Sequence, residues 1–190
     1  GLNHRTAPVE LREKMALTGC ALTMALEDLQ HYRHIEPLDV DGQPSGAIHE
    51  GVILSTCNRL ELYTVVDNAE IARQRLEMFL AQLQNIPLKD IVPHLYCLRD
   101  TDVVRHLMRV ACGLDSMILG EPQILGQVTQ SFGDAQGANL TGPVLSHLFS
   151  QAIHAGKRAH TETDISRFTT SVSHAGARMV MDRMGHLSPP

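Results

Sequence analysis

Long hydrophobic runs are missing from this chain of 190 residues. No apolar stretch approaches the roughly 20 residues that a helix needs to cross a bilayer, and the first residues lack the charged and then apolar pattern of a secretory signal. Hydrophobic residues still make up 43% of the chain and charged residues only 19%, which favours a buried core over a disordered segment. We therefore expect a soluble, cytoplasmic protein of one domain or two small ones, without contact to a membrane.

Cysteine is scarce, and an excess of positive charge is absent. Four scattered cysteines are too few for a disulfide scaffold, so free thiols are expected. A formal net charge of -5 argues against general affinity for nucleic acid but leaves room for a local basic face. Neither the Gly-x-Gly-x-x-Gly turn nor the Gly-x-x-x-x-Gly-Lys-Ser/Thr loop occurs, so the chain carries no evident site for a dinucleotide or a nucleoside triphosphate.

The first hundred residues mix helical and strand patterns. After a first strand that ends at the start of the chain, hydrophobic spacing and turn residues predict one helix or two over residues 9–30, a loop over 36–50, strands over 52–54 and 60–66, a helix over 71–83 and a strand over 94–98. This order, strand, helix, strand, strand, helix, strand, predicts an α+β fold of the ferredoxin-like βαββαβ type.

From residue 101 onward the pattern is helical. Helices are predicted over residues 101–112, 117–135, 144–161 and 170–184, with a turn-rich connection over 133–143. The sequence therefore predicts a small helical bundle after the sandwich. We expect three parts, namely residues 1–100 as the ferredoxin-like part, 101–168 as the helical part and 169–190 as a linker helix.

Cys57 lies in a polar connection, residues 55–59, between two predicted strands. A thiol in this position is held by rigid strands and open to solvent, and Arg59 is near enough to stabilise the nucleophilic thiolate. The alternative is a buried apolar cysteine, which the polar neighbours disfavour. Cys20 in a helical pattern and Cys97 in an apolar strand are expected in the core. Cys112 is expected at a helix C-terminus, whose dipole raises the pKa of a thiol.

A nucleophilic cysteine needs a partner that accepts or donates a proton. His106 is the candidate because it flanks the apolar stripe of its helix, although a boundary histidine without a role would look the same. A metal site is not expected. His31 and His34 share a helical face without a third ligand, while His94 and Cys97 would point to opposite sides of a strand.

Two further stretches are open to two interpretations. Residues 113–127 are rich in glycine and polar side chains, which is typical either of a helix-to-helix turn or of the wall of a pocket for a small polar substrate. The C-terminal third has a basic bias, which is either a solvated face or a surface that positions a phosphate backbone. The basic residues are Lys157, Arg158, His160, Arg167, Arg178 and Arg183.

Four segments of the chain closely resemble glutamyl-tRNA reductase. They read GLNHRTAPV (residues 1–9), STCNRLELY (residues 55–63), RHLMRVACGLDSMILGEPQILGQV (residues 105–128) and AGKRAHTETDI (residues 155–165). The resemblance runs in order to about Ile165 and more weakly to Met184. It implies NADPH-dependent reduction of glutamyl-tRNA to glutamate-1-semialdehyde, the first step of tetrapyrrole and heme biosynthesis.

The same resemblance implies roles for individual residues. Cys57 is the implied nucleophile that forms a glutamyl thioester, and His106 matches a functionally important histidine. Arg59 is our choice for the contact to the substrate carboxylate. The residues that match the family's substrate pocket are Thr56, Asn58, Arg59, Ser116, Glu121, Pro122, Gln123 and Gln127.

Members of that family continue into an NADPH-binding domain and a dimerisation domain, so the chain resembles the catalytic domain alone. The resemblance implies that NADPH binds outside this chain, that the full-length protein is a homodimer, and that the aminomutase acting next is a further partner. The chain itself is expected to be monomeric and only to transacylate or hydrolyse. Two alternatives stay open, namely a non-enzymatic glutamyl-tRNA-binding or regulatory module and a free-standing thiol esterase.

Overall fold

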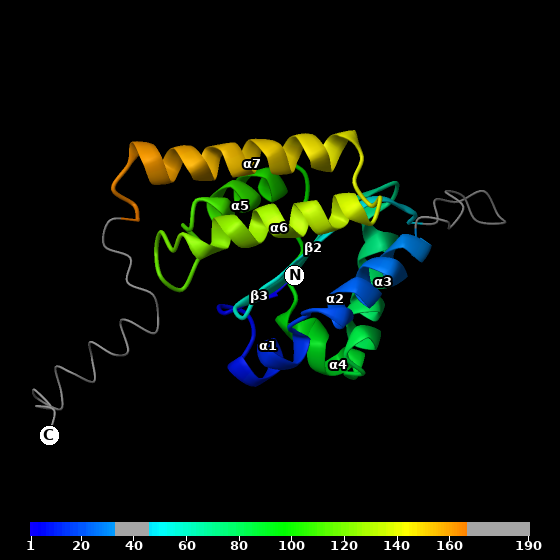
Figure 1. The fold of residues 1–190 in the computed structure, drawn as a ribbon. Coiled ribbons are helices and arrows are strands. Elements are labelled where there is room, and N and C mark those ends of the chain that lie inside the picture. Colours follow the sequence, from blue (N-terminus) through cyan, green and yellow to red (C-terminus); the bar gives the residue numbers. More distant parts are fainter. Residues whose placement is uncertain (33–45, 167–190) are drawn as a thin grey trace, which may run out of the picture.

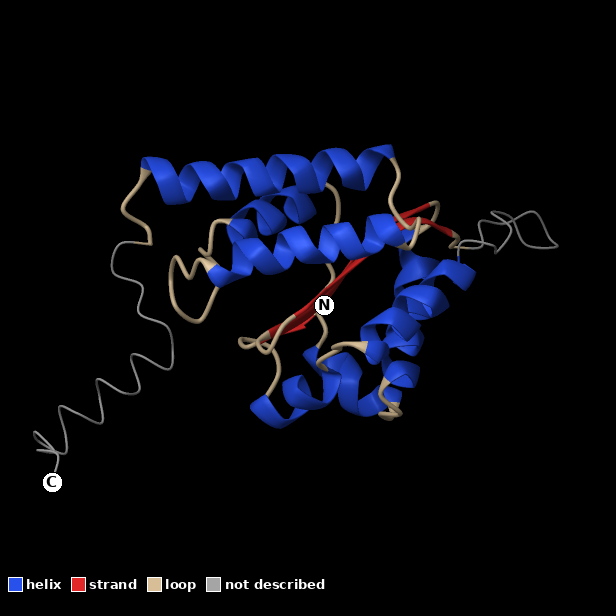
Figure 2. Cartoon of the chain, in the orientation of Figure 1, coloured by secondary structure: helices blue, strands red, loops and turns tan. Residues whose placement is uncertain are grey.

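The computed structural model describes residues 1–32 and 46–166. Figure 1 shows a small sheet between two groups of helices, with α5, α6 and α7 on one side and α1 to α4 on the other. Figure 2 shows how little of the described chain is strand. The mixed composition of helix and strand agrees with the α+β prediction.

The sheet has three antiparallel strands in the order β1-β3-β2. β1 spans Leu2–Asn3, β2 spans Ile48–Ser55 and β3 spans Arg59–Val66. Ser55 pairs with Leu60, and Thr56 N donates to Arg59 O at 2.8 Å, which closes the hairpin around Cys57. The predicted hairpin is thus confirmed. β2 begins earlier than predicted, and the other part of the predicted loop, up to residue 45, lies outside the described residues.

The first group of helices follows the predicted pattern. α1 spans Val9–Met15 and α2 spans Cys20–His31, and they are separated at Gly19, whose φ of 52° favours glycine. α3 spans Ala69–Leu83 and begins at Asn68, whose side chain accepts from the N–H groups of Glu70 and Ile71. A short α4, Leu88–Ile91, follows. These helices bury apolar faces against the sheet and each other.

The predicted strand over residues 94–98 is wrong. A 3-10 turn, Val92–His94, occupies its start, and beyond this turn only Tyr96 exchanges backbone hydrogen bonds with Gly1, at 2.8 Å each. The physical reason is that β1 offers a very short edge for pairing. The ferredoxin-like order is therefore not confirmed. Cys97 is exposed rather than buried in the core, and so is Cys20, which opens α2 ahead of the buried stripe.

The second group consists of α5, Thr101–Ala111, α6, Gln123–Gly137, and α7, Pro143–Glu162. α6 starts later than predicted because a glycine-rich loop occupies the residues before Pro122, and it runs on through the expected turn at residue 133. α7 lies close to α5 at Gly156, where a Cβ atom would be 2.6 Å from Ala111 O. The predicted helix over 170–184 lies outside the described residues.

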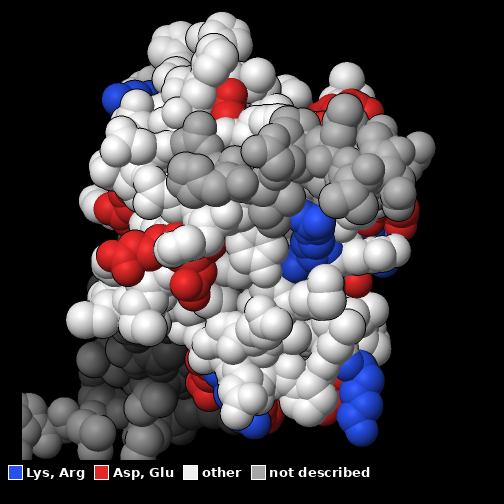
Figure 3. Space-filling model, turned by 90° about the vertical axis from the view of Figure 1, so that its right-hand side faces the viewer, with Lys and Arg blue, Asp and Glu red and all other residues white. Residues whose placement is uncertain are grey.

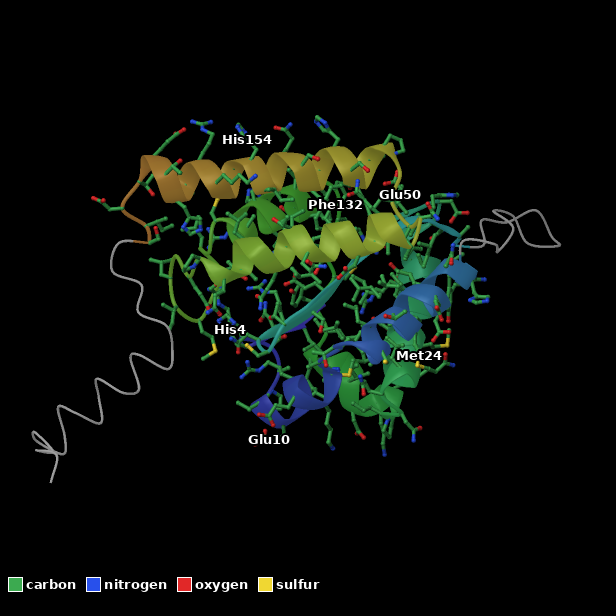
Figure 4. All side chains as sticks on the ribbon, viewed as in Figure 1. His4, Glu10, Met24, Glu50, Phe132 and His154 are labelled. Atoms are coloured by element: carbon green, nitrogen blue, oxygen red, sulfur yellow. The ribbon has the colours of Figure 1, made fainter. Side chains whose placement is uncertain are left out.

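Glu50 joins the sheet to α7. It lies beside an irregularity at the start of β2, it is 5% exposed, and its carboxylate accepts from the N–H groups of Val144 at 3.1 Å and Leu145 at 2.7 Å. Figure 4 shows Glu50 near the start of α7. A remote carboxylate thus satisfies the free N–H groups at this helix N-terminus and interacts favourably with the helix dipole. Within the described residues, no helix is both long and apolar enough to span a bilayer.

Candidate active site

Cys57 lies exposed at the tip of the β2–β3 hairpin. The turn beneath it is held by Thr56, whose Oγ1 accepts from the N–H groups of Asn58 and Arg59 at 3.1 Å each. Such a side-chain-to-backbone motif fixes a turn without the need for glycine. The thiol is therefore presented to solvent on a rigid support, as the sequence predicts.

The segment around α1 clamps this turn from the side. Arg12 Nη1 donates to Asn58 Oδ1 at 2.6 Å, and Leu17 N donates to Ser55 Oγ at 2.8 Å. Arg12 is 8% exposed, so this contact is shielded from water. The start of the chain thereby holds one residue on each side of Cys57, namely Ser55 and Asn58.

Arg59 points into the protein rather than toward solvent. Its guanidinium, 2% exposed, donates through Nη1 to Glu61 Oε1 at 2.7 Å and through Nη2 to Asp115 O at 2.6 Å. Tyr63 also donates to Glu61, at 2.5 Å. Arg59, Glu61 and Tyr63 alternate along β3, so they share one face of the strand. In this structure the charge of Arg59 is used to hold a buried carboxylate and the loop after α5.

His106 is the second predicted catalytic residue, and it reaches the same network from α5. Its Nε2 lies 3.0 Å from Glu61 Oε1, and Tyr96 donates to that oxygen at 2.5 Å. Burial by itself would raise the pKa of Glu61, but the hydrogen bond to His106 and the charge of Arg59 outweigh it and lower the pKa to about 2. Glu61 is therefore a fixed negative charge that orients the imidazole.

Cys57 and His106 belong to different parts of the site. No hydrogen bond joins them in the described chain, and the hollow of about 140 Å³ that His106 lines with Glu61, Tyr96 and Cys97 does not include Cys57. They are connected through β3, where Arg59 and Glu61 lie between the two groups.

The loop between α5 and α6 lies against the hairpin because Arg59 binds Asp115 O. Its ends meet at Gly113 and Gly120, both with positive φ, where Gly120 N donates to Gly113 O at 2.9 Å. This close approach explains the glycines. The loop brings Ser116 next to Asp115 and thus near the hairpin, while the other predicted substrate-binding residues follow along the loop and the first turns of α6. These are Glu121, Pro122, Gln123 and Gln127.

Cys112 caps the C-terminus of α5 and is half-buried, and burial raises the pKa of its thiol. It is therefore a poor nucleophile at neutral pH. Exposure alone does not single out Cys57, since Cys20 and Cys97 are exposed as well. Cys57 differs from these two cysteines because it lies in a polar turn held by hydrogen bonds of Thr56 and Asn58. Across the described residues, no group of three His, Cys, Asp or Glu side chains is arranged to hold a metal ion.

Sequence reasoning missed four residues of this site: Arg12, Glu61, Tyr96 and Asp115. A signal for Glu61 was present, since polar residues at every second position of β3 predict a polar strand face. Asp115 belongs to a loop that was recognised only by composition. Arg12 and Tyr96 reach the site through tertiary contacts, which local periodicity does not reveal.

A family model and curated relatives of this chain agree with each other. The model of the family "Glutamyl-tRNAGlu reductase, N-terminal domain" matches residues 1–163. Glutamyl-tRNA reductases from Shouchella clausii and from Synechocystis are each 44% identical to the chain, over 94% and 95% of its length, and the match covers 37% and 39% of their own. The chain thus spans well under half the length of these relatives.

A solved structure agrees with the sequence relatives. The glutamyl-tRNA reductase from Methanopyrus kandleri superposes with a TM-score of 0.66 at 30% identity, covering 95% of this chain and 38% of that protein. The fold, the hairpin with its exposed thiol and the family match are mutually consistent. The chain belongs to the family of glutamyl-tRNA reductase N-terminal domains.

Proposed function

We propose that this chain is the acyl-accepting catalytic part of a glutamyl-tRNA reductase and that Cys57 takes the glutamyl group from the tRNA. The observation that carries the proposal is the exposed thiol on a turn fixed by Thr56 and by Arg12 through Asn58. A rigidly presented nucleophile with polar neighbours suits attack on an activated carbonyl. In the complete enzyme the thioester would then be reduced to glutamate-1-semialdehyde, which enters tetrapyrrole biosynthesis.

In the proposed step the Cys57 thiolate forms a bond to the ester carbonyl carbon, and the bond from that carbon to the ribose oxygen breaks. The ribose oxygen leaves with a proton, and the glutamyl thioester stays on the protein. We assign the proton transfer to His106, whose orientation is fixed by Glu61 at 3.0 Å. Since no hydrogen bond joins His106 to Cys57 in the described chain, we assign it to the leaving group and not to the thiol.

We assign recognition of the glutamyl group to the residues that surround the hairpin tip and the loop after α5. Amide, hydroxyl and charged side chains of these segments match the carboxylate and amine of a glutamyl group. Besides its proposed contact with the glutamyl group, Arg59 positions the loop between α5 and α6, because its guanidinium binds Asp115 O. The proposed set is Thr56, Asn58, Arg59, Ser116, Glu121, Pro122, Gln123 and Gln127.

NADPH, which supplies the hydride for the reduction, is proposed to bind outside this chain. The residues present do not fit the cofactor, because the sequence contains no glycine-rich dinucleotide turn. The curated relatives are far longer than the match, which leaves room for such a domain. We propose that the complete enzyme is a homodimer in the cytoplasm that passes its product to an aminomutase, and that this chain alone is a monomer.

The experiment that tests the function supplies this chain with glutamyl-tRNA. The thioester should form, and water should then hydrolyse it because Cys57 is exposed to solvent in this chain tested by itself. Slow release of free glutamate and uncharged tRNA is expected, with no change on addition of NADPH and no semialdehyde. Complete inertness toward glutamyl-tRNA would contradict the proposal and favour a binding module, and NADPH-dependent semialdehyde would show that the cofactor site lies within the chain.

The outer face of α7 is the proposed contact to the tRNA backbone. Lys157 is exposed there, and Figure 4 shows His154 projecting from the same helix away from the sheet. Arg158 is also exposed but binds Glu162 at 2.8 and 2.9 Å. By contrast, on the described part of the face shown in Figure 3, Lys and Arg form separate spots among acidic and uncharged side chains.

Replacing Lys157 and Arg158 by alanine should weaken tRNA binding and flatten its salt dependence. Each lost phosphate contact lowers the slope of log K against log salt by about 0.7 to 0.9. Filter binding between low and physiological salt measures this slope. Lys89→Ala on α4, an exposed lysine in the opposite group of helices, is the matched control and should leave the slope unchanged. Equal slopes for the unsubstituted chain, the double variant and the Lys89→Ala control would show that the outer face of α7 is solvated and does not contact the tRNA.

A further inference from the structure

The side-chain amide of Asn58 has a defined orientation because Arg12 fixes it. A guanidinium has only donors, so the atom that it meets must be the carbonyl oxygen of the amide. Arg12 Nη1 lies 2.6 Å from Asn58 Oδ1. The Nδ2 group is thereby turned away from Arg12, and it makes no hydrogen bond within the described residues. A free donor thus stands one residue from the exposed thiol of Cys57.

Arg12 itself has an unusual environment. It is 8% exposed, no carboxylate lies within 4 Å of it among the described residues, and its Nε is buried without a partner. A buried charge without a counter-ion costs several kcal/mol, so a buried guanidinium in this state calls for an explanation. The contact to Asn58 is the one hydrogen bond of the guanidinium in the described part of the chain. The charge therefore polarises this amide and would stabilise an anion that forms beyond it.

The backbone N–H groups of Asn58 and Arg59 and the guanidinium of Arg59 already have acceptors. Thr56 Oγ1 accepts the N–H groups of both Asn58 and Arg59. The guanidinium of Arg59 is bound to Glu61 and to Asp115 O. The donors beside the sulfur that have no partner in the described residues are Asn58 Nδ2, the N–H of Cys57 and the hydroxyl of Thr56. Of these, Asn58 Nδ2 is the one that a buried positive charge orients.

We propose that Asn58 Nδ2 donates a hydrogen bond to the oxyanion that forms when Cys57 attacks the glutamyl ester, and that Arg12 is the residue that positions Asn58 for this contact. This inference rests on the proposed function. When the sulfur bonds to the carbonyl carbon, the π electron pair moves to the carbonyl oxygen, and it returns when the ribose oxygen leaves. Donors fixed in advance at that oxygen stabilise the transition state more than the ground state.

The test compares two reactions of the same thiol. Thioester formation from glutamyl-tRNA passes through an oxyanion, whereas alkylation by iodoacetamide does not. Asn58→Ala should slow single-turnover thioester formation by about 10²- to 10³-fold and change alkylation of Cys57 by less than about threefold. Peptide mass spectrometry is required because Cys20 and Cys97 are exposed as well. Equal losses in both reactions would overturn the proposal and leave Asn58 as a support of the turn.

The variant Asn58→Asp distinguishes the two roles of this side chain, namely hydrogen-bond donation through Nδ2 and contact with Arg12 through Oδ1. Aspartate keeps the contact to Arg12 but replaces the N–H donor by an acceptor. We expect thioester formation to be at least as slow as in Asn58→Ala. Activity close to that of the unsubstituted chain would overturn the proposal. Absence of thioester in the unsubstituted chain would instead overturn the proposed function, and this inference with it.

A double variant tests the role of Arg12. Arg12→Met should slow thioester formation by about tenfold or more, because the amide is free to turn. Combined with Asn58→Ala, it should add no further loss, since Arg12 acts through Asn58. Multiplying effects would show that Arg12 contacts the substrate itself and would overturn its positioning role. Circular dichroism and the alkylation rate of Cys57 verify that the Arg12→Met chain is folded.

Discussion

Cys57→Ser is expected to abolish the glutamyl adduct, with a loss of acyl transfer on the order of 10³-fold or more. Serine keeps the size of the side chain but does not ionise near neutral pH, and among the described residues no base is hydrogen-bonded to residue 57. The fold should be unaffected because the side chain is exposed and the turn is held by Thr56. Acid quench after mixing with labelled glutamyl-tRNA, followed by mass spectrometry, measures the adduct.

Cys20→Ser is the matched control for this experiment. Cys20 is an exposed thiol as well, but it lies at the start of α2 and outside the proposed site. Its replacement should leave the amount and rate of adduct unchanged. Retention of the adduct in Cys57→Ser, or its loss in Cys20→Ser, would remove Cys57 as the nucleophile.

The second large effect is expected on stability. Glu61→Ala should lower the free energy of unfolding by about 3 to 5 kcal/mol, because it leaves the buried guanidinium of Arg59 without its carboxylate. Tyr63 and Tyr96 would also lose their acceptor. Urea unfolding at neutral pH measures the loss. The control is Glu70→Ala, which breaks a solvent-exposed ion pair to Arg99 and should cost far less stability. Similar losses in the two variants would contradict the role of the buried network.

The same carboxylate predicts a pH dependence. The pKa of Glu61 is lowered from 4.5 to about 2 in the folded chain, so ionised Glu61 favours the folded state. Its contribution is fully present above pH 4.5 and is lost as the pH falls from there to about 2, in total roughly 3 kcal/mol. Urea midpoints over this range should fall more steeply for the unsubstituted chain than for Glu61→Gln. Parallel curves would show that Glu61 is not held in its charged form.

Local patterns predicted most of the elements and the placement of Cys57. The strands on either side of residues 55–59 were readable because apolar and polar residues alternate there and turn-forming residues lie between them. The break at Gly19 and the boundaries of α5 and α7 followed from glycine, proline and helical spacing. An exposed thiol at the tip of the hairpin is a direct consequence of that local arrangement.

What local patterns could not predict depends on contacts between distant residues. The strand over 94–98 did not form, because a strand needs a partner edge and β1 pairs only through Leu2 and Asn3. The burial of Arg59 on Glu61 is a second case, since the spacing of β3 alone does not decide which partner the guanidinium takes. The direct pairing of His106 with Glu61 likewise joins residues that are 45 positions apart.

The cap that Glu50 provides to the N-terminus of α7 couples the formation of this helix to that of the β2–β3 hairpin. Glu50 and Leu145 are 95 positions apart, and beside this contact Gly51 N donates to Leu140 O at 2.8 Å. The N-terminus of the longest helix is thus completed only when the hairpin is in place. Contacts of such high sequence separation slow folding and make the elements they join cooperative. We therefore expect residues 1–100 and 101–166 to unfold together, since the N–H groups at the start of α7 take their acceptor from β2.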